Sequence, residues 1–382
     1  MSVSSGTRPL PRWIDIGLIP ALNIVLALFV SGLIIAATGE DPFAAVKIMI
    51  EGSIGTDYGI GYTLYYATNF AFTGLAVAIA FHTGLFNIGG EGQAYVGGLG
   101  VGLMLLVFDQ HLPFALLMPL GILAAALFGG AWALIPAYLQ AYRGSHIVIT
   151  TIMFNFIASA LMVYLMVNVF IKPGQMSPQS RDFDVAGHLP FMHEVFAWFG
   201  VEITRTPLNI SVFWAIICCI GIWAYIWRTR WGYQLRAVGH NEKAAIYAGV
   251  DPRKVIVLSM CISGGLAGMV GLNEIMGVQH KLLLNYAAGY GFTGIAVSLM
   301  GRNHPFGIVL ASLLFGILYQ GGAELAFEIP TITRESIVMI QGLVILFSGA
   351  LAYMSTPTIS KIYNRILDAR QSSPDPVVGE EA

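Results

Sequence analysis

The chain contains few charged residues. Only 10% of its 382 residues are Asp, Glu, Lys or Arg, whereas soluble domains average about 25%. Apolar residues make up 56%, and the mean hydropathy is +0.73. This composition excludes an ordinary soluble enzyme and suits a chain that has a lipid bilayer as its solvent. We therefore expect an all-α polytopic membrane protein.

The chain also has almost no excess of charge of one sign and few cysteines. The 19 basic and 21 acidic side chains give a net charge of −2, and no long run of Lys or Arg provides a field that attracts nucleic acid. The three cysteines, Cys218, Cys219 and Cys261, lie in apolar runs without the spacing of a metal site or a secreted disulfide framework. We expect buried thiols, no metal or cofactor, and no nucleic-acid partner.

The sequence lacks an energy source of its own. It has no Gly-x-x-x-x-Gly-Lys-Ser/Thr phosphate loop, because none of its six lysines precedes Ser or Thr. Its carboxylates fall in loops or near the ends of apolar segments, whereas ion-coupled carriers usually place a titratable group near the bilayer midplane. An intramembrane enzyme is disfavoured because His82 and His146 have no obvious carboxylate partner. The chain is therefore expected not to be an enzyme, and either to be passive or to use a separate motor.

Apolar segments long enough to be considered as membrane spans occur about ten times. The first is longer than the apolar core of a signal peptide, so it is kept as a span. The ten candidate segments are 16–38, 60–81, 88–108, 113–139, 146–171, 209–227, 255–276, 282–300, 305–320 and 336–354.

The basic residues indicate an orientation. With the N-terminus in the cytoplasm, 13 of them fall inside and 6 outside, as the positive-inside rule requires, so both termini are expected to be cytoplasmic. The longest extramembrane stretches are an outer loop at 172–208 and an inner loop at 228–254. Neither is large enough for a separate domain. We expect one transmembrane domain over 1–355 and a disordered cytoplasmic tail over 356–382.

A short stretch of sequence occurs twice. Phe72-Thr73-Gly74-Leu75-Ala76-Val77-Ala78-Ile79-Ala80 is similar to Phe292-Thr293-Gly294-Ile295-Ala296-Val297-Ser298-Leu299-Met300, 220 residues later. Both copies run in the same direction by the span count, which indicates a parallel repeat of spans 1–4 and 7–10. Chance similarity between two Gly-rich apolar segments is the alternative.

The inner loop contains a short helix signal. Asn241 is a favourable N-cap, Glu242 suits the positive end of a helix, Gly249 can close it in the left-handed conformation, and Pro252 prevents its continuation. Two turns are too few to persist alone. The small and aromatic residues Ala244, Ala245, Tyr247 and Ala248 form a surface that a partner's groove can approach closely. The alternative is an incidental turn in a positively charged inside loop.

Three segments carry a resemblance to a known family. They are the loop segment 235–250 (Leu-Arg-Ala-Val-Gly-His-Asn-Glu-Lys-Ala-Ala-Ile-Tyr-Ala-Gly-Val), 84–93 (Gly-Leu-Phe-Asn-Ile-Gly-Gly-Glu-Gly-Gln) and 301–307 (Gly-Arg-Asn-His-Pro-Phe-Gly). They resemble the permease subunits of ATP-binding-cassette importers in the simple-sugar, nucleoside and branched-chain-amino-acid branch, and are most like nucleoside-type permeases. The resemblance covers roughly residues 60–355. The loop lacks the strict Glu-Ala-Ala order of such coupling segments.

The resemblance implies a location, partners and a coupling site. The location is the bacterial cytoplasmic membrane. The partners are an ATP-binding subunit, a second permease subunit, identical or paralogous, and a periplasmic or lipid-anchored solute-binding protein. Contact with the ATP-binding subunit would involve Arg236, Gly239, Asn241, Glu242, Ala244, Ala245, Tyr247 and Gly249.

Polar and aromatic residues within the spans are candidates for a translocation path. Asn87 and Glu91 are one helical turn apart, as are Thr151 and Asn155, so each pair is expected to share a helix face. A structural alternative exists for each: a helix cap for Glu91, a bond to its own helix carbonyl for each Thr, and lipid or helix packing for each Phe. The candidates are Asn69, Phe72, Thr73, Asn87, Glu91, Gln93, Thr151, Asn155, Asn273, Glu274, Phe292 and Thr293.

Glycine and alanine pairs four residues apart, such as Gly264 and Gly268, are assigned to close helix packing. The sequence thus predicts the permease subunit of an ATP-driven importer that moves a nucleoside or simple sugar by alternating access. The alternative is a stand-alone channel or secondary carrier for a small polar solute.

Overall fold

The computed structural model describes residues 11, 14, 18–37, 39–333, 336–343, 346, 359, 360, 363 and 364. The elements in this part of the chain are helices, with two isolated β-bridges, Gln179 with Leu283 and Phe191 with Asn209. The expected all-α class is confirmed.

Within the described residues, seven helices are long and apolar enough to cross a membrane, or eight if one bent pair counts as a span. The seven are α3 (Asp57–His82), α4 (Gly90–Phe108), α5 (Phe114–Arg143), α6 (Ile147–Asn168), α8 (Ser211–Arg228), the continuous segment Pro252–Gln279, and α13 (Pro305–Glu328). Segment Pro252–Gln279 consists of α11 (Pro252–Gly268) followed by a π-helix, Leu272–Gln279. The bent pair joins Val25–Ala37 of α1 (Ile19–Ala37) to α2 (Pro42–Ile54) at 119°.

The expected number of about ten spans is not confirmed. Segment 282–300 forms only an 11-residue helix, α12 (Tyr290–Met300), because the residues before it take left-handed conformations at His280, Asn285, Ala288 and Gly289. Most of segment 336–354 lies outside the described residues.

The chain divides into two compact units, one within residues 1–46 and 326–382 and the other over 47–325. In the first unit, the Thr331 hydroxyl donates to the Glu40 carboxylate at 2.5 Å. The second unit contains the candidate site residues. The predicted tail over 356–382 falls almost entirely outside the described residues.

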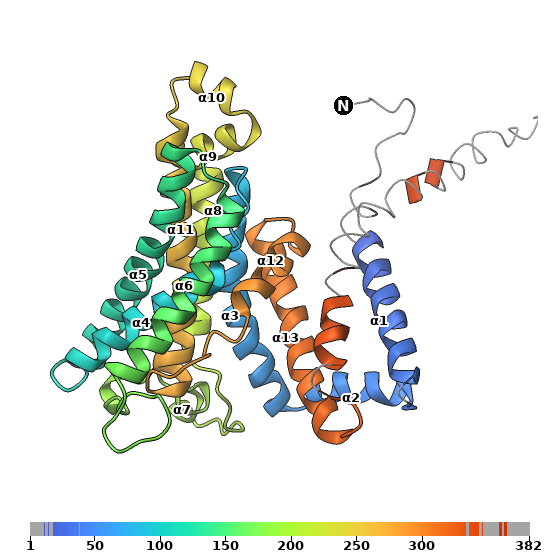
Figure 1. The fold of residues 1–382 in the computed structure, drawn as a ribbon. Helices are drawn as coiled ribbons and strands as arrows, with labels where there is room; N and C mark the ends of the chain where they lie inside the picture. The colour runs from blue at the N-terminus through green and yellow to red at the C-terminus, as the bar shows by residue number, and fades with distance from the viewer. Residues whose placement is uncertain are drawn as a thin grey trace, which may run out of the picture. The chain divides into compact units, whose positions relative to one another are not determined.

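Helix α3 is the most buried spanning helix of the second unit, and α11 and α12 pack along it. Helices α5, α6 and α8 are the least buried of the spanning helices, and their exposed side chains are largely apolar, which suits contact with lipid. Figure 1 shows α9 (Arg230–His240) and α10 (Glu242–Tyr247) beyond one end of these helices, and α7 (Met192–Ala197) at the opposite end.

Small residues allow α5 and α11 to pack backbone against backbone. A Cβ atom on Gly264 would lie 2.4 Å from the Gly129 carbonyl oxygen, and one on Gly268 would lie 2.3 Å from the Ala125 carbonyl oxygen. The packing role expected for the small-residue pair is therefore confirmed. The prediction that all three thiols are buried is confirmed only for Cys219, because Cys218 and Cys261 are partly exposed.

Candidate translocation path and coupling loop

Two interrupted spans meet through their helix starts. After α3 ends, residues 85–88 have no regular secondary structure and α4 begins only at Gly90, while α12 begins at Tyr290 after the irregular segment 280–289. A Cβ atom on Gly291 would lie 2.2 Å from the Glu91 backbone nitrogen. The starts of α4 and α12 are therefore packed against each other without intervening side chains.

Glu91 ties these two helix starts together. Its Oε1 accepts a hydrogen bond from the Gly289 backbone N–H at 2.9 Å, and its Oε2 accepts one from the Gly291 N–H at 2.8 Å. The carboxylate thus satisfies two backbone donors at the start of α12, where the helix dipole favours a negative charge. Sequence reasoning considered a cap for Glu91, but for the helix that contains it rather than for α12.

Asn87 does not share a helix face with Glu91, because it lies in segment 85–88, before α4 begins. The expectation that these two residues face the same side of one helix is therefore wrong. Its Nδ2 donates to Gln93 Oε1 and to Ser263 Oγ, both at 2.9 Å. Ser263 Oγ in turn donates to the Ala76 carbonyl at 2.5 Å. Asn87 therefore connects segment 85–88 by hydrogen bonds to α11 and, through Ser263, to α3.

A second polar cluster surrounds Glu274 inside the π-helix. Glu274 Oε1 accepts from the Tyr65 hydroxyl at 2.5 Å and from Asn69 Nδ2 at 2.7 Å. Asn273 Nδ2 donates to Asn69 Oδ1 at 2.9 Å, and Asn273 Oδ1 accepts from Asn209 Nδ2 at 2.8 Å. The cluster joins α3, the π-helix and the start of α8.

Glu274 is buried although it lies near the end of its span, where the sequence analysis placed the carboxylates. It precedes the end of segment Pro252–Gln279 by five residues, and only 2% of its surface is exposed. The enclosure of its carboxylate by Tyr65 and Asn69 was not predicted from the sequence.

Most other path candidates bond within the protein. The hydroxyls of Thr73 and Thr151 donate to carbonyls of their own helices, at 3.1 Å to Asn69 and 2.8 Å to Ile147. This is the structural alternative weighed for isolated threonines. Asn155 Nδ2 donates to the Ile88 carbonyl and its Oδ1 accepts from the Gly92 N–H, both at 2.9 Å, so it holds the start of α4.

The two copies of the repeated motif face each other. A Cβ atom on Gly294 would lie 2.5 Å from Thr73 Cβ, so α12 packs against the matching part of α3. Phe72 is fully buried, whereas 49% of Phe292 is exposed. The two phenylalanines therefore occupy different environments, and Phe72 does not offer its ring to a solute. Thr293 Oγ1 lies 3.0 Å from the hydroxyl of Tyr319 on α13.

Sequence reasoning missed a row of tyrosines on α3 and α13. Tyr58, Tyr62 and Tyr66 follow at four-residue intervals along α3, and Tyr319 of α13 continues the row. Neighbouring ring centroids lie 4.7 Å apart for Tyr58 and Tyr62, 6.5 Å for Tyr62 and Tyr66, and 5.7 Å for Tyr66 and Tyr319. The four-residue spacing was the available signal.

The expected helix in the inner loop is present. Asn241 Oδ1 accepts from the Ala244 N–H at 3.1 Å as the N-cap of α10, and Gly249 has a φ of +79°. One surface assignment is wrong, because Ala245 is 2% exposed and packs against Val238 and Val250. Tyr247 is 95% exposed and Ile246 is 55% exposed, so Tyr247 is the large side chain that α10 exposes most.

A backbone contact links the coupling loop to the central helix. A Cβ atom on Gly239 would lie 2.2 Å from the His82 carbonyl oxygen and 3.0 Å from the Gly84 nitrogen. His82 Nε2 lies 3.0 Å from the Asn303 carbonyl oxygen. The end of α9 therefore touches the turn after α3, and the same turn is bound to the segment after α12.

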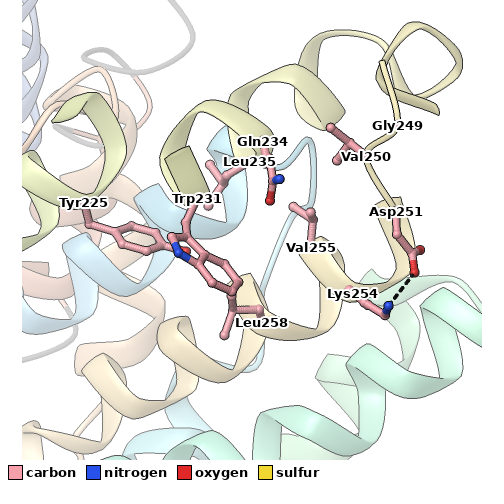
Figure 2. Close-up of a pocket in the computed structure, with 10 residues that line it drawn as sticks. All are labelled: Tyr225, Trp231, Gln234, Leu235, Gly249, Val250, Asp251, Lys254, Val255 and Leu258. Carbon is pink, nitrogen blue, oxygen red and sulfur yellow. Dashed lines mark ion pairs between the residues drawn. The ribbon is translucent and has the colours of Figure 1, made fainter. Parts of the chain in front are cut away.

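An open cleft lies beside this contact. Figure 2 shows its lining, which comes from the end of α8, from α9, from the turn after α10 and from the start of α11. Its volume is about 230 Å³. Asp251 and Lys254 form an ion pair at its edge, with 3.6 Å between Oδ2 and Nζ. The lining residues are Tyr225, Trp231, Gln234, Leu235, Gly249, Val250, Asp251, Lys254, Val255 and Leu258.

At the opposite end, an ion pair fixes the 172–208 loop to the end of α4. Arg181 donates from Nη1 and Nη2 to the two carboxylate oxygens of Asp109, each at 2.7 Å. Burial alone would raise the pKa of Asp109, but the hydrogen bonds from Arg181 and from the Asp184 N–H outweigh it and hold the pKa below its usual value.

Comparison with known proteins identifies the family. The family model described as "Branched-chain amino acid transport system / permease component" matches residues 59–349. The chain is 35% identical over 331 residues to the guanosine ABC transporter permease protein NupP of Bacillus subtilis, covering 86% of this chain and 92% of that protein. It is 33% identical over 342 residues to the glucose ABC transporter permease protein TsgB13 of Haloferax volcanii, covering 89% and 88%. It is 32% identical over 308 residues to the nucleoside ABC transporter permease protein NupB of Lactococcus lactis, covering 80% and 83%.

The chain belongs to this family of transport-system permeases. The resemblance drawn from the sequence is therefore confirmed. The protein is a multi-pass membrane permease subunit of an ATP-binding-cassette transporter and not an enzyme.

Proposed function

We propose that this permease subunit imports a nucleoside by alternating access, driven by a separate ATP-binding subunit that docks on α10. Two relatives with guanosine or nucleoside in their names support the nucleoside. A simple sugar is the second candidate, because the Haloferax relative is named for glucose at similar identity. The proposal includes the cytoplasmic placement of both termini, a second permease subunit and an external solute-binding protein.

The backbone contact of Gly239 with the turn after α3 is the observation that carries the proposal. A force on Tyr247 acts on a two-turn helix that is packed on α9 through Ala245 and Val238. Since Gly239 touches His82 and Gly84 without an intervening side chain, movement of α9 must displace that turn. Segment 85–88, which leads into α4, follows this turn directly.

From this segment the displacement can reach the helix starts in the middle of the fold. Asn87 bonds the segment to α11, and Glu91 bonds the start of α4 to the start of α12. A shift of the coupling loop therefore changes contacts made by two interrupted spans. Interrupted spans of this kind are where transporters commonly form their solute path. Among the other candidate residues, Gln93 Nε2 donates to Asn87 Oδ1, while Arg236 lies on α9 and Glu242 and Ala244 lie on α10.

The buried carboxylate of Glu274 is a reason to test the alternative function, a stand-alone ion-coupled carrier. A carboxylate buried within a span is a common feature of such carriers. Uphill uptake by the purified chain in liposomes, without an ATP-binding subunit, would favour that alternative. Uptake that requires the ATP-binding subunit and ATP is expected.

The main experiment uses Gly239→Ala with Gly221→Ala as the matched control. The added methyl at 239 meets backbone atoms that cannot move aside, whereas a Cβ at 221 on α8 has no heavy atom within 4 Å. Uptake of labelled guanosine by the complete complex should fall at least about tenfold for Gly239→Ala. An overpacked contact costs about 1–3 kcal/mol, and about 1.4 kcal/mol added to the barrier of the transport cycle slows it tenfold. The control should match the wild type. Normal uptake by Gly239→Ala would refute the transmission route.

A second pair tests the docking face. Tyr247→Asp should release the ATP-binding subunit during purification, because it places a charge at the outermost side chain of α10. Tyr247→Phe retains the ring and should bind it normally. Equal recovery of the ATP-binding subunit with both variants would show that α10 is not the docking site.

A further inference from the structure

The tyrosine strip consists of Tyr58, Tyr62 and Tyr66 on α3 and Tyr319 on α13. Its rings are connected by centroid distances of 4.7 to 6.5 Å, so it forms a continuous aromatic surface. All four side chains are at least partly exposed. They differ in this from Phe70 and Tyr65 on the same helix, which are buried.

The strip runs from one end of α3 toward the start of α12. Tyr58 is the second residue of α3, and Tyr319 at the other end lies 3.0 Å, hydroxyl to hydroxyl, from Thr293. Phe292, which is about half exposed, neighbours Thr293 in sequence. The strip therefore joins a helix end to the region where Glu91 ties the two interrupted spans together.

The charges near the strip limit what it can bind. Neither α3, α12 nor α13 contains Lys or Arg. The nearest charged group given by α13 is Glu324, which interacts electrostatically with Tyr58 and accepts a hydrogen bond from Gln320 Nε2 at 3.0 Å. None of these three helices therefore offers a cation to a phosphate, whereas a neutral solute with N–H donors suits the carboxylate.

We propose that the tyrosine strip is a stacking track for the planar base of an uncharged nucleoside. The inference rests on the proposed function and names the part of the solute that the path recognises. Aromatic rings stack on any nucleobase because every base has a π-face, and the tyrosine hydroxyls can bond to the ribose or base edge. A series of similar rings lets a base pass from one to the next without one dominant binding site.

Other occupants of this face predict different results. Tyrosines also occur at membrane interfaces, where the ring contacts lipid. A second permease subunit could instead cover the strip. Leucine in place of tyrosine would satisfy a lipid contact, and loss of a subunit contact would weaken assembly for every solute alike.

The test compares Tyr66→Leu and Tyr319→Leu with the corresponding phenylalanine variants and with Tyr164→Leu, an exposed tyrosine on α6. Each is assayed in the complete transporter, with its ATP-binding and solute-binding partners. Uptake of labelled guanosine should fall about tenfold in the two leucine variants, within the range that stacking on one ring provides. The phenylalanine variants should retain uptake within about twofold, and Tyr164→Leu should match the wild type. Guanosine monophosphate should not compete.

The outcomes separate this inference from the proposed function. Failure of the wild-type complex to take up guanosine would overturn the nucleoside function itself. Wild-type uptake with unchanged uptake by both leucine variants would overturn the strip alone and favour a lipid contact. Leucine variants that lose the second permease during purification would also overturn it, in favour of a subunit interface.

Discussion

Removing the carboxylate of Glu91 should loosen the contact between the two interrupted spans. Glu91→Gln leaves one acceptor oxygen and places an amide N–H₂ against one of the two backbone donors, Gly289 or Gly291, which are now bonded at 2.9 and 2.8 Å. A hydrogen bond to a charged group contributes about 1.5–3 kcal/mol. We therefore expect the free energy of unfolding to fall by about 2 kcal/mol, and by more for Glu91→Ala, which leaves both donors without their partner.

The assay is thermal unfolding of the purified transporter in detergent, followed by uptake in membranes. A loss of about 2 kcal/mol should lower Tm by roughly 2–3 °C for a chain of 382 residues. Glu202→Gln, at an exposed position of the 172–208 loop, is the control for removing a negative charge. Uptake should also fall in Glu91→Gln because the start of α12 is less firmly placed. A Tm and an uptake rate equal to those of Glu202→Gln would refute the capping argument.

Three further predictions concern the 172–208 loop, His280 and the helix packing. Arg181→Met should destabilise the 172–208 loop by about 3 kcal/mol or more, because Asp109 would remain buried without its partner; protease cleavage of the loop reports this, and unchanged resistance would contradict it. Burial and the His188 ring stacked 3.6 Å away lower the pKa of His280 to about 4, so stability should be full above about pH 6.5 and decline as the pH falls toward 4, since only the unfolded state gains the proton; His280→Asn should flatten this dependence of Tm on pH. Gly264→Leu should prevent α5 and α11 from packing and abolish recovery of folded protein by size-exclusion chromatography, and a normal elution profile would contradict the close contact.

Long apolar runs and local caps were predictable from the sequence. Helices α5 and α6 follow uninterrupted apolar segments, so a hydropathy window finds them. The short helix α10 was predictable from Asn241 and Gly249, because cap chemistry is local and does not depend on distant contacts. The family resemblance rested on this loop and on segments 84–93 and 301–307.

The interrupted spans were not predictable in the same way. A window of about 19 residues averages over segment 280–289, where four left-handed residues stop the helix. The burial of both Asn273 and Glu274 depends on the π-helix, which changes the angular spacing assumed for an α-helix. Ala245 could have faced either side, because a two-turn helix gives too short a pattern to show which face is packed.

The contact of Gly239 with His82 and Gly84 also bears on how such a transporter can change its cargo. Main-chain atoms meet there, so the proposed connection to the ATP-binding subunit would be independent of side-chain chemistry at the turn. Substitutions among the tyrosines of α3 and α13 leave that connection intact. The proposed route therefore implies that one ATP-binding subunit can drive permeases that carry different solutes, provided that position 239 stays a glycine.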